Sequence, residues 1–146
     1  MSTDKKQSGF SEAEREAMKE RTKELRAEAR LSKNREEGER VLLEAVKAMP
    51  KPDRDLAARI HEIVKKNAPM LFPKTWYGMP AYANQDGKVI CFFQSADKFK
   101  ARYATFGFND MAKLDKGNMW PTSFALVKLS SAEESIIAEL VKKAVS

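Results

Sequence analysis

The sequence has very little of the chemistry on which most enzyme and metal-binding motifs depend. Its 146 residues include one cysteine and one histidine. A single cysteine excludes an internal disulfide and any metal site built from several cysteines. A serine or cysteine hydrolase needs a base beside its nucleophile, and His61 is the one imidazole that could serve. We therefore expect a protein that is not an enzyme and carries no resident cofactor.

Long apolar runs are missing too. The longest, Val89 to Phe93, is far shorter than the ~20 residues that cross a bilayer. The first residues, Met1 to Gly9, are polar and lack the apolar centre of a signal peptide. The sequence also lacks a glycine-rich phosphate loop and a calcium-loop pattern. These features predict a cytoplasmic protein that does not contact a membrane.

The formal net charge of +6 is concentrated in the C-terminal three quarters of the chain. Residues 1–40 hold 11 Lys and Arg against 10 Asp and Glu, so they contribute +1, and the remaining residues contribute +5. A positive charge of this kind favours anionic partners at low salt. It is also common on ordinary soluble surfaces, and both interpretations remain open. Part of this charge lies in the predicted sheet region, on Lys88, Lys98, Lys100, Arg102, Lys113, Lys116 and Lys128.

The polar and charged residues of the N-terminal part predict a tail followed by a charged helical arm. Residues 1–10 are polar, and we expect them to be disordered. Ser11 and Glu14 form a capping-box pattern, so a helix should begin at Glu12 and run to about Leu31. The polar residues 32–38 then predict a linker, so that the arm and linker together span 11–38. The arm is either a solvated helix or a helix that binds a partner.

Residues 39–146 predict a single domain. Helical spacing of apolar residues indicates helices over 39–49 and 53–68, the second capped by Asp53, and a capping-box pattern at Ser131 and Glu134 indicates a third helix. Runs of apolar and aromatic residues predict strands over 74–82, 89–93, 102–108 and 123–129, with a hairpin turn at Asp86-Gly87. Helices, a meander of strands and a final helix indicate an α+β fold, with an antiparallel sheet of about four or five strands packed with helices.

Two reactive side chains are expected to be structural. His61 lies on the edge of the apolar face of its helix, so we predict a half-buried ring. The pattern His61-Glu62 opens a zincin-like motif, but position 65 is lysine and the second ligand is absent. Cys91 lies in a strand that is apolar on both faces, as in a central strand covered on both sides, which predicts a buried and inert thiol.

An aromatic cluster is the most site-like feature of the sequence. Its tryptophans and tyrosines have an apolar body and a polar tip, and lysines are near them in sequence. A cleft lined in this way, beneath the segment Gly78-Met79-Pro80, would suit a small ligand that is partly apolar or anionic. The same residues could instead serve the core alone. The candidate ligand-binding residues are Trp76, Tyr77, Met79, Tyr82, Lys98, Tyr103 and Trp120.

Three segments together resemble a known family. They are Lys-Thr-Trp-Tyr-Gly-Met-Pro-Ala-Tyr (74–82), Gly-Lys-Val-Ile-Cys-Phe-Phe-Gln (87–94) and Arg-Tyr-Ala-Thr-Phe-Gly-Phe (102–108). From about Val41 to the C-terminus the chain resembles the YdhG-like family of unknown function, which is grouped with the frataxin-like iron chaperones and the YjbR/CyaY-type proteins. The resemblance implies a compact α+β domain and supplies no catalytic residues.

Three functions are therefore open. The first is a binding domain for a small molecule or a protein partner at the Trp-Tyr-Gly-Met-Pro segment. The second, implied by the resemblance, is an iron chaperone, and Asp110 and Asp115 are the close carboxylates of the sheet region. The third is single-stranded nucleic acid binding through Lys98, Lys100, Arg102 and Lys128. Phe106 and Phe108 could stack on bases in that case, although core packing is the favoured role for both rings.

Overall fold

The structure, a computed structural model, describes residues 11–146, apart from the side chains of Ala27, Glu28 and Leu31. The chain divides into two compact units, residues 1–34 and 35–146. The predicted tail, residues 1–10, lies outside the described residues. The boundary between the units falls inside the segment that the sequence marks as a linker.

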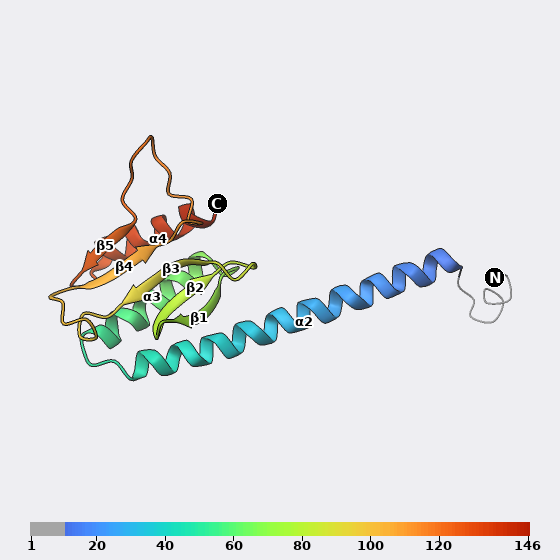
Figure 1. Cartoon of the computed structure of the whole chain (residues 1–146), viewed down its shortest axis with the longest axis horizontal. Helices are drawn as coiled ribbons and strands as arrows, with labels where there is room; N and C mark the ends of the chain where they lie inside the picture. Colours follow the sequence, from blue (N-terminus) through green and yellow to red (C-terminus); the bar gives the residue numbers. More distant parts are fainter. Residues whose placement is uncertain (1–10) are drawn as a thin grey trace. The chain divides into compact units, whose positions relative to one another are not determined.

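The first described element is the helix α2, Glu12–Lys47 (Figure 1). The predicted capping box is present, because the Ser11 N–H donates to Glu14 Oε1 at 2.7 Å and the Glu14 N–H donates to Ser11 Oγ at 3.1 Å. The predicted linker is wrong, since residues 32–38 continue the helix. Polar residues are compatible with a helix, and Gly38 is accommodated because it packs against a neighbouring strand, as described below.

The second unit is an α+β fold. After residues 35–47 of α2, the chain forms α3 (Asp53–Asn67), β1 (Phe72–Trp76), β2 (Met79–Ala83), β3 (Val89–Gln94), β4 (Ala104–Phe108), β5 (Ser123–Leu126) and α4 (Ser131–Val145). The five strands form one sheet in the order β1-β2-β3-β4-β5, with every neighbouring pair antiparallel. In Figure 1, α3 and α4 lie behind the sheet.

The strand predicted over 74–82 is in fact two strands. Tyr77 and Gly78 form a tight turn between β1 and β2, and Trp76 pairs with Met79 across it. The sequence pattern hid this turn because its first residue is an aromatic that is typical of strands. Consequently the sheet has one strand more than the four that the sequence locates.

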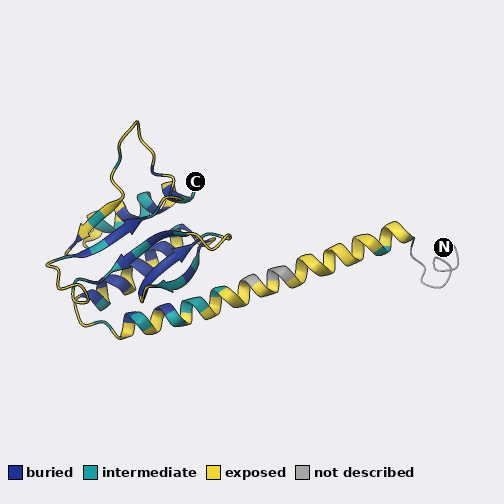
Figure 2. Cartoon of the chain, in the orientation of Figure 1, coloured by how far each residue is buried: buried dark blue, intermediate teal, exposed yellow. Residues whose placement is uncertain are grey.

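The core lies between the helices and one face of the sheet. In β4, Ala104, Phe106 and Phe108 are buried and Thr105 is half-buried, so the phenylalanines fill the core. Figure 2 shows that β2, β3 and β4 are largely buried. Cys91 is fully buried in the central strand, as predicted, and burial raises the pKa of its thiol. The largest fully buried side chains include Tyr82, Phe93, Phe106, Leu42, Ile60, Val64 and Val141.

The opposite face of the sheet is covered locally by aromatic rings rather than by helices. The Phe92 ring lies on Gly107, where a Cβ would come within 2.5 Å of Phe92 Cζ. Trp76 packs against Phe92 with ring centroids 5.3 Å apart. The central strand β3 is therefore covered on both sides, but the second cover consists of half-buried side chains.

Two predicted helix caps are displaced in the structure. The capping box of α4 is formed by Ser130 and Glu133, one residue before the predicted pair, and Glu134 instead accepts two hydrogen bonds from Arg59, both at 2.8 Å. Asp53 is the first residue of α3 rather than its cap, and its buried carboxylate accepts a hydrogen bond from the Asp97 N–H at 2.9 Å. The hydrogen bond from Asp97 to Asp53 ties α3 to the connection after β3. Among the helices that the structure describes, none is long and apolar enough to cross a membrane.

Candidate ligand-binding site

The candidate site begins at the turn between β1 and β2. Tyr77 and Gly78 have positive φ angles of 52° and 77°, as a type I′ hairpin turn requires. Glycine adopts this conformation freely, whereas tyrosine does so at a cost. The turn leaves the Tyr77 side chain 80% exposed, with its ring against the edge of Trp76 at 5.2 Å between centroids.

Lys98 joins this turn to the connection between β3 and β4. Its Nζ donates a 2.8 Å hydrogen bond to the Tyr77 carbonyl oxygen, and its backbone N–H donates to Ser95 Oγ at 3.3 Å. Gly78 suits this arrangement because of its positive φ, and a Cβ at that position would lie 2.8 Å from Lys98 Nζ, so the lysine would have to shift. Two segments that are distant in the sequence are thus connected by one ammonium group.

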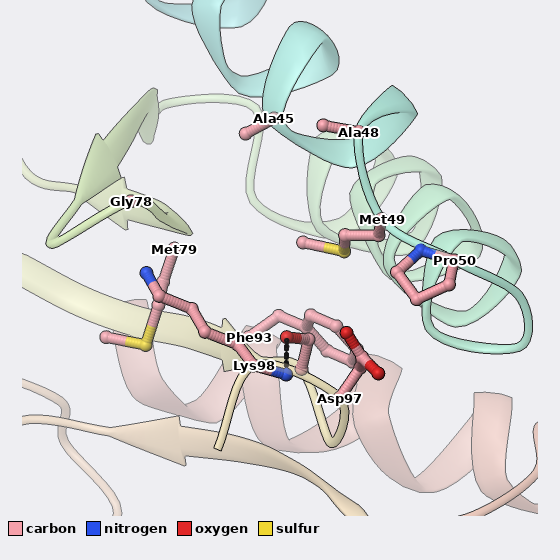
Figure 3. A pocket seen from close by; sticks show the side chains of 10 residues that line it. Ala45, Ala48, Met49, Pro50, Gly78, Met79, Phe93, Asp97 and Lys98 are labelled. Atoms are coloured by element: carbon pink, nitrogen blue, oxygen red, sulfur yellow. Dashed lines mark hydrogen bonds between the residues drawn. The ribbon is translucent and has the colours of Figure 1, made fainter. Parts of the chain in front are cut away.

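A cavity of about 250 Å³ lies beside this contact (Figure 3). Phe93 and Met79 give it a buried apolar wall, and the exposed Asp97 and Lys98 bring charge to its edge. In Figure 3 the side chain of Lys98 extends toward Gly78, and the Asp97 carboxylate lies on the side of Pro50. The lining residues are Ala45, Ala48, Met49, Pro50, Gly78, Met79, Phe93, Ser95, Asp97 and Lys98.

The structure brings together four of the seven residues that the sequence singled out. Met79 and Lys98 line the cavity, Tyr77 supplies the carbonyl that holds Lys98, and Trp76 packs against Tyr77. Tyr103 is half-buried on the connection between β3 and β4, with the Arg102 guanidinium 5.3 Å from its ring centroid. Tyr103 does not line the cavity.

Tyr82 does not belong to the candidate site. It pairs with Cys91 in the sheet, is 2% exposed and has its hydroxyl 2.9 Å from His61 Nδ1. Its predicted ligand-binding role fails for a physical reason, because both its ring and its hydroxyl are occupied inside the core. Burial raises the pKa of this hydroxyl, which keeps it protonated.

Trp120 also lies elsewhere. It belongs to the connection between β4 and β5, which is at the other end of the sheet from the Tyr77-Gly78 turn. There it lines a separate cavity of about 540 Å³, together with Asp110 and Asp115. Among the residues that the structure describes, no group of three or more His, Cys, Asp or Glu side chains could hold a metal ion.

The sequence did not identify the wall of the cavity that α2 supplies. Ala45 lies in the last turn of α2, and Ala48 and Met49 follow directly after that helix, whereas Phe93 lies in β3 and Ser95 directly after it. The sequence pattern predicts a helix over 39–49 and does not mark these residues as the wall of a site. Small side chains at 45 and 48 were a possible signal for open space, but alanine is equally common in well-packed helices.

His61 forms the centre of a buried polar network that the sequence missed. The side chain is 5% exposed rather than half-buried, because its helix packs against β2 and α2 on both sides of the ring. Its Nε2 lies 2.7 Å from Glu39 Oε2, a carboxylate that also accepts from Lys65 Nζ at 2.9 Å. Hydrogen bonds from Lys65 first, and then from His61, lower the pKa of Glu39. The network satisfies every polar atom of the imidazole.

The basic residues named for nucleic acid binding lie at one end of the sheet. Lys98, Lys100 and Arg102 are exposed on the connection between β3 and β4, and Lys128 follows β5. Phe99, beside Lys98, is also exposed, whereas Phe106 and Phe108 are core residues. An aromatic platform on β4 is therefore not available for bases.

A scan against protein-family models, a search of curated proteins and a search of solved structures each found no match to this chain. The resemblance to the YdhG-like family is therefore a proposal. It depends on three segments together, and in this structure 74–82 forms most of β1, the turn and most of β2, 87–94 includes β3, and 102–108 includes β4. The cavity and its chemistry carry the functional argument that follows.

Proposed function

We propose that this protein is a cytoplasmic, non-enzymatic binding domain whose cavity beside Gly78 takes a small anionic ligand with an apolar part. The observation that supports the proposal is the cavity itself. It is lined by Gly78 and Met79, in the segment beneath which the ligand-binding hypothesis expects a cleft, and Lys98 lies at its edge. The resemblance to the YdhG-like family is compatible with this function and does not name the ligand.

The size of the cavity limits the ligand. A volume of about 250 Å³ is below the ~300–1,000 Å³ of pockets for drug-sized molecules, which favours a compact metabolite. The apolar part of the ligand would contact Met49, Met79 and Phe93. Methionine side chains are flexible and polarizable, so two of these walls can adapt to different apolar shapes.

Lys98 supplies the anion-binding group. A lysine ammonium has three N–H donors, and the Tyr77 carbonyl accepts one of them. The remaining donors can bind a carboxylate or phosphate without breaking that hydrogen bond. Asp97 borders the same cavity and would repel an anion on its own side, so the anionic group belongs at the Lys98 end.

The test is an amide NMR titration with benzoate, a compact anion with an apolar ring, and with benzyl alcohol as its uncharged counterpart. We expect saturable shifts for benzoate at the amides of Gly78, Met79 and Ser95, and weaker shifts for benzyl alcohol. Lys98→Met keeps the apolar stem and removes the ammonium, so it should weaken benzoate binding about tenfold or more, as expected for loss of a charged hydrogen bond.

Lys100→Met is the matched control. It removes the same charge from the same connection, and Lys100 does not line the cavity. Equal loss of binding in both variants, or benzoate shifts that map elsewhere, would contradict the proposal. An anaerobic titration with ferrous iron tests the iron-chaperone alternative separately, since broadening confined to the amides near Asp110 and Asp115 would favour iron binding instead.

A further inference from the structure

Most cations of the N-terminal arm, residues 12–34 of α2, lie on one side of the helix, although acidic and basic residues alternate along the sequence. Two charges depart from this pattern, since Arg21 lies on the opposite side and Glu12 lies in line with the cations, N-terminal to them. At 3.6 residues per turn, Lys19, Lys23, Arg26, Arg30 and Lys33 fall within a sector of about 80° on the helix surface. All five side chains are exposed. We call these five residues the basic stripe. It follows the helix for about 21 Å, at 1.5 Å per residue.

The two flanks of the basic stripe have different chemistry. Glu16, Glu20 and Glu24 occupy an adjoining sector centred about 100° away from the middle of the stripe. On the other flank are Met18 and Leu25, which are 50% and 48% exposed. Within the described part of the arm, Lys19 pairs with Glu16 at 3.7 Å, an exposed contact that is worth little and that an anionic partner can replace.

A narrow line of cations matches a linear polyanion. Duplex nucleic acid carries one negative charge per about 1.7 Å of its axis, so a stripe of about 21 Å faces many phosphates. An anionic membrane is a poorer match, because helices that lie on membranes bury a broad apolar face, whereas the described side chains of the arm include two exposed large apolar ones, Met18 and Leu25.

We infer that the basic stripe is a nucleic acid binding surface that lies along the phosphates of a duplex without reading its sequence. A helix inserted in the major groove would bring both of its flanks against the groove walls. Here one flank is acidic, so repulsion from the phosphates keeps the helix out of the groove and leaves the stripe along one strand. This surface is independent of the cavity beside Gly78.

The full chain should be tested against a fluorescein-labelled 24-base-pair DNA duplex by fluorescence anisotropy between 50 and 200 mM salt. Each phosphate contact contributes about 0.9 to the slope of log affinity against log salt, so five contacts predict a slope of about −4.5. Two duplexes of unrelated sequence should bind within about twofold of each other, because phosphate contacts carry no base information. Absence of binding at 50 mM salt overturns the inference.

The decisive variant replaces Lys19, Lys23 and Arg26 with glutamine, which has a similar helix propensity. Its slope should become shallower by about 2.7, which is three contacts. The control replaces Lys88, Lys142 and Lys143 with glutamine, so that both variants carry a net charge of +6 − 3 = +3. Equal weakening in the two variants would mean that overall charge binds the duplex, and the inference would fail.

Two further measurements separate the remaining explanations. A double variant, Lys19→Arg with Lys23→Arg, keeps the charge of the basic stripe and should bind the duplex as tightly as the unmodified chain does. Loss of binding in this variant would show that the charge of the stripe is not the determinant. Vesicles with phosphatidylserine test the membrane alternative. If the chain binds these vesicles more tightly than the duplex, and the stripe variant loses that binding, the partner is a membrane and the inference is wrong.

Discussion

Gly38 lies in the interior of α2, where glycine normally destabilises a helix by about 1 kcal/mol relative to alanine. The structure explains its presence. A Cβ at Gly38 would fall well inside contact distance of the Pro73 carbonyl oxygen in β1. This neighbour is backbone within a paired strand, so it cannot rotate away as a side chain could. Gly38→Ala should therefore force this part of α2 away from β1.

The cost follows from the contacts around Gly38. Overpacking of this kind costs about 1–3 kcal/mol, and the rigid backbone neighbour places this site near 3 kcal/mol. Separation also weakens the hydrogen bonds from Arg35 to the carbonyls of Leu71 and Met70, at 3.4 and 3.3 Å, and its contact with the Phe72 ring at 4.2 Å. Subtracting about 1 kcal/mol for the better helix propensity of alanine leaves a net loss of about 2 kcal/mol.

The assay can observe the second unit alone. Both tryptophans, Trp76 and Trp120, lie in residues 35–146, so their fluorescence reports unfolding of that unit without the arm. At about 4 °C per kcal/mol, Gly38→Ala should lower the melting temperature by about 8 °C. Ser32→Ala, at an exposed helical position, is the control and should leave it unchanged. A Gly38→Ala protein that melts at or above the unmodified temperature would refute the close approach of α2 to β1.

Two further predictions concern the polar network and the turn. Glu39→Gln should lower the free energy of unfolding by about 1–3 kcal/mol at neutral pH. Because the folded-state pKa of Glu39 is lowered, the contribution of the carboxylate is complete above its usual pKa of 4.5 and should disappear as pH falls through the folded-state pKa. A loss of stability in urea unfolding that is the same at pH 7 and pH 3 would contradict the assignment. Tyr77→Asn should raise the free energy of unfolding by about 0.5–1 kcal/mol, because asparagine adopts positive φ more readily. It should preserve benzoate binding, because the backbone carbonyl of residue 77 still accepts the hydrogen bond from Lys98. A less stable variant would count against the type I′ turn.

The fold class could be predicted from the sequence because strong periodic signals define most elements. Apolar spacing located α3, a capping-box pattern located the start of α4 to within one residue, and a run of apolar and aromatic residues located β4. The continuity of α2 could not be predicted, because polar residues and a glycine at 32–38 are equally typical of a linker. Only the position of the Pro73 carbonyl, more than thirty residues away in the chain, explains why Gly38 belongs in the helix.

The error over the first strand has a direct consequence for the site. In an antiparallel meander, successive connections alternate between the two ends of the sheet. Because the turn at Tyr77-Gly78 was missed, the predicted sheet had one reversal of chain direction too few, and Trp120 could not be placed relative to that segment. With five strands, the connection that holds Trp120 is at the opposite end from the turn.

Tyr82 could have been placed correctly. A hairpin centred on Asp86-Gly87 pairs Tyr82 with Cys91, and paired residues share one face of a sheet. Because Cys91 was already predicted to be buried, Tyr82 should have been assigned to the core. The structure has this pairing, with a register shift between Tyr82 and Ala83 that compensates for a longer loop. Its partner His61 carried no such signal, since the contact joins separate elements.

The cavity beside Gly78 was the hardest feature to predict, because it is defined by side chains that are small or absent. An opening of about 250 Å³ at the surface exists only where the neighbouring side chains are too small to fill it. Ala45 and Ala48 leave space along the end of α2, and Gly78 leaves space at the turn, where a Cβ would meet Lys98 Nζ. Larger side chains at these positions would fill the opening without disturbing any hydrophobic pattern. A sequence motif reports the groups that are present, whereas this site depends equally on the groups that are missing.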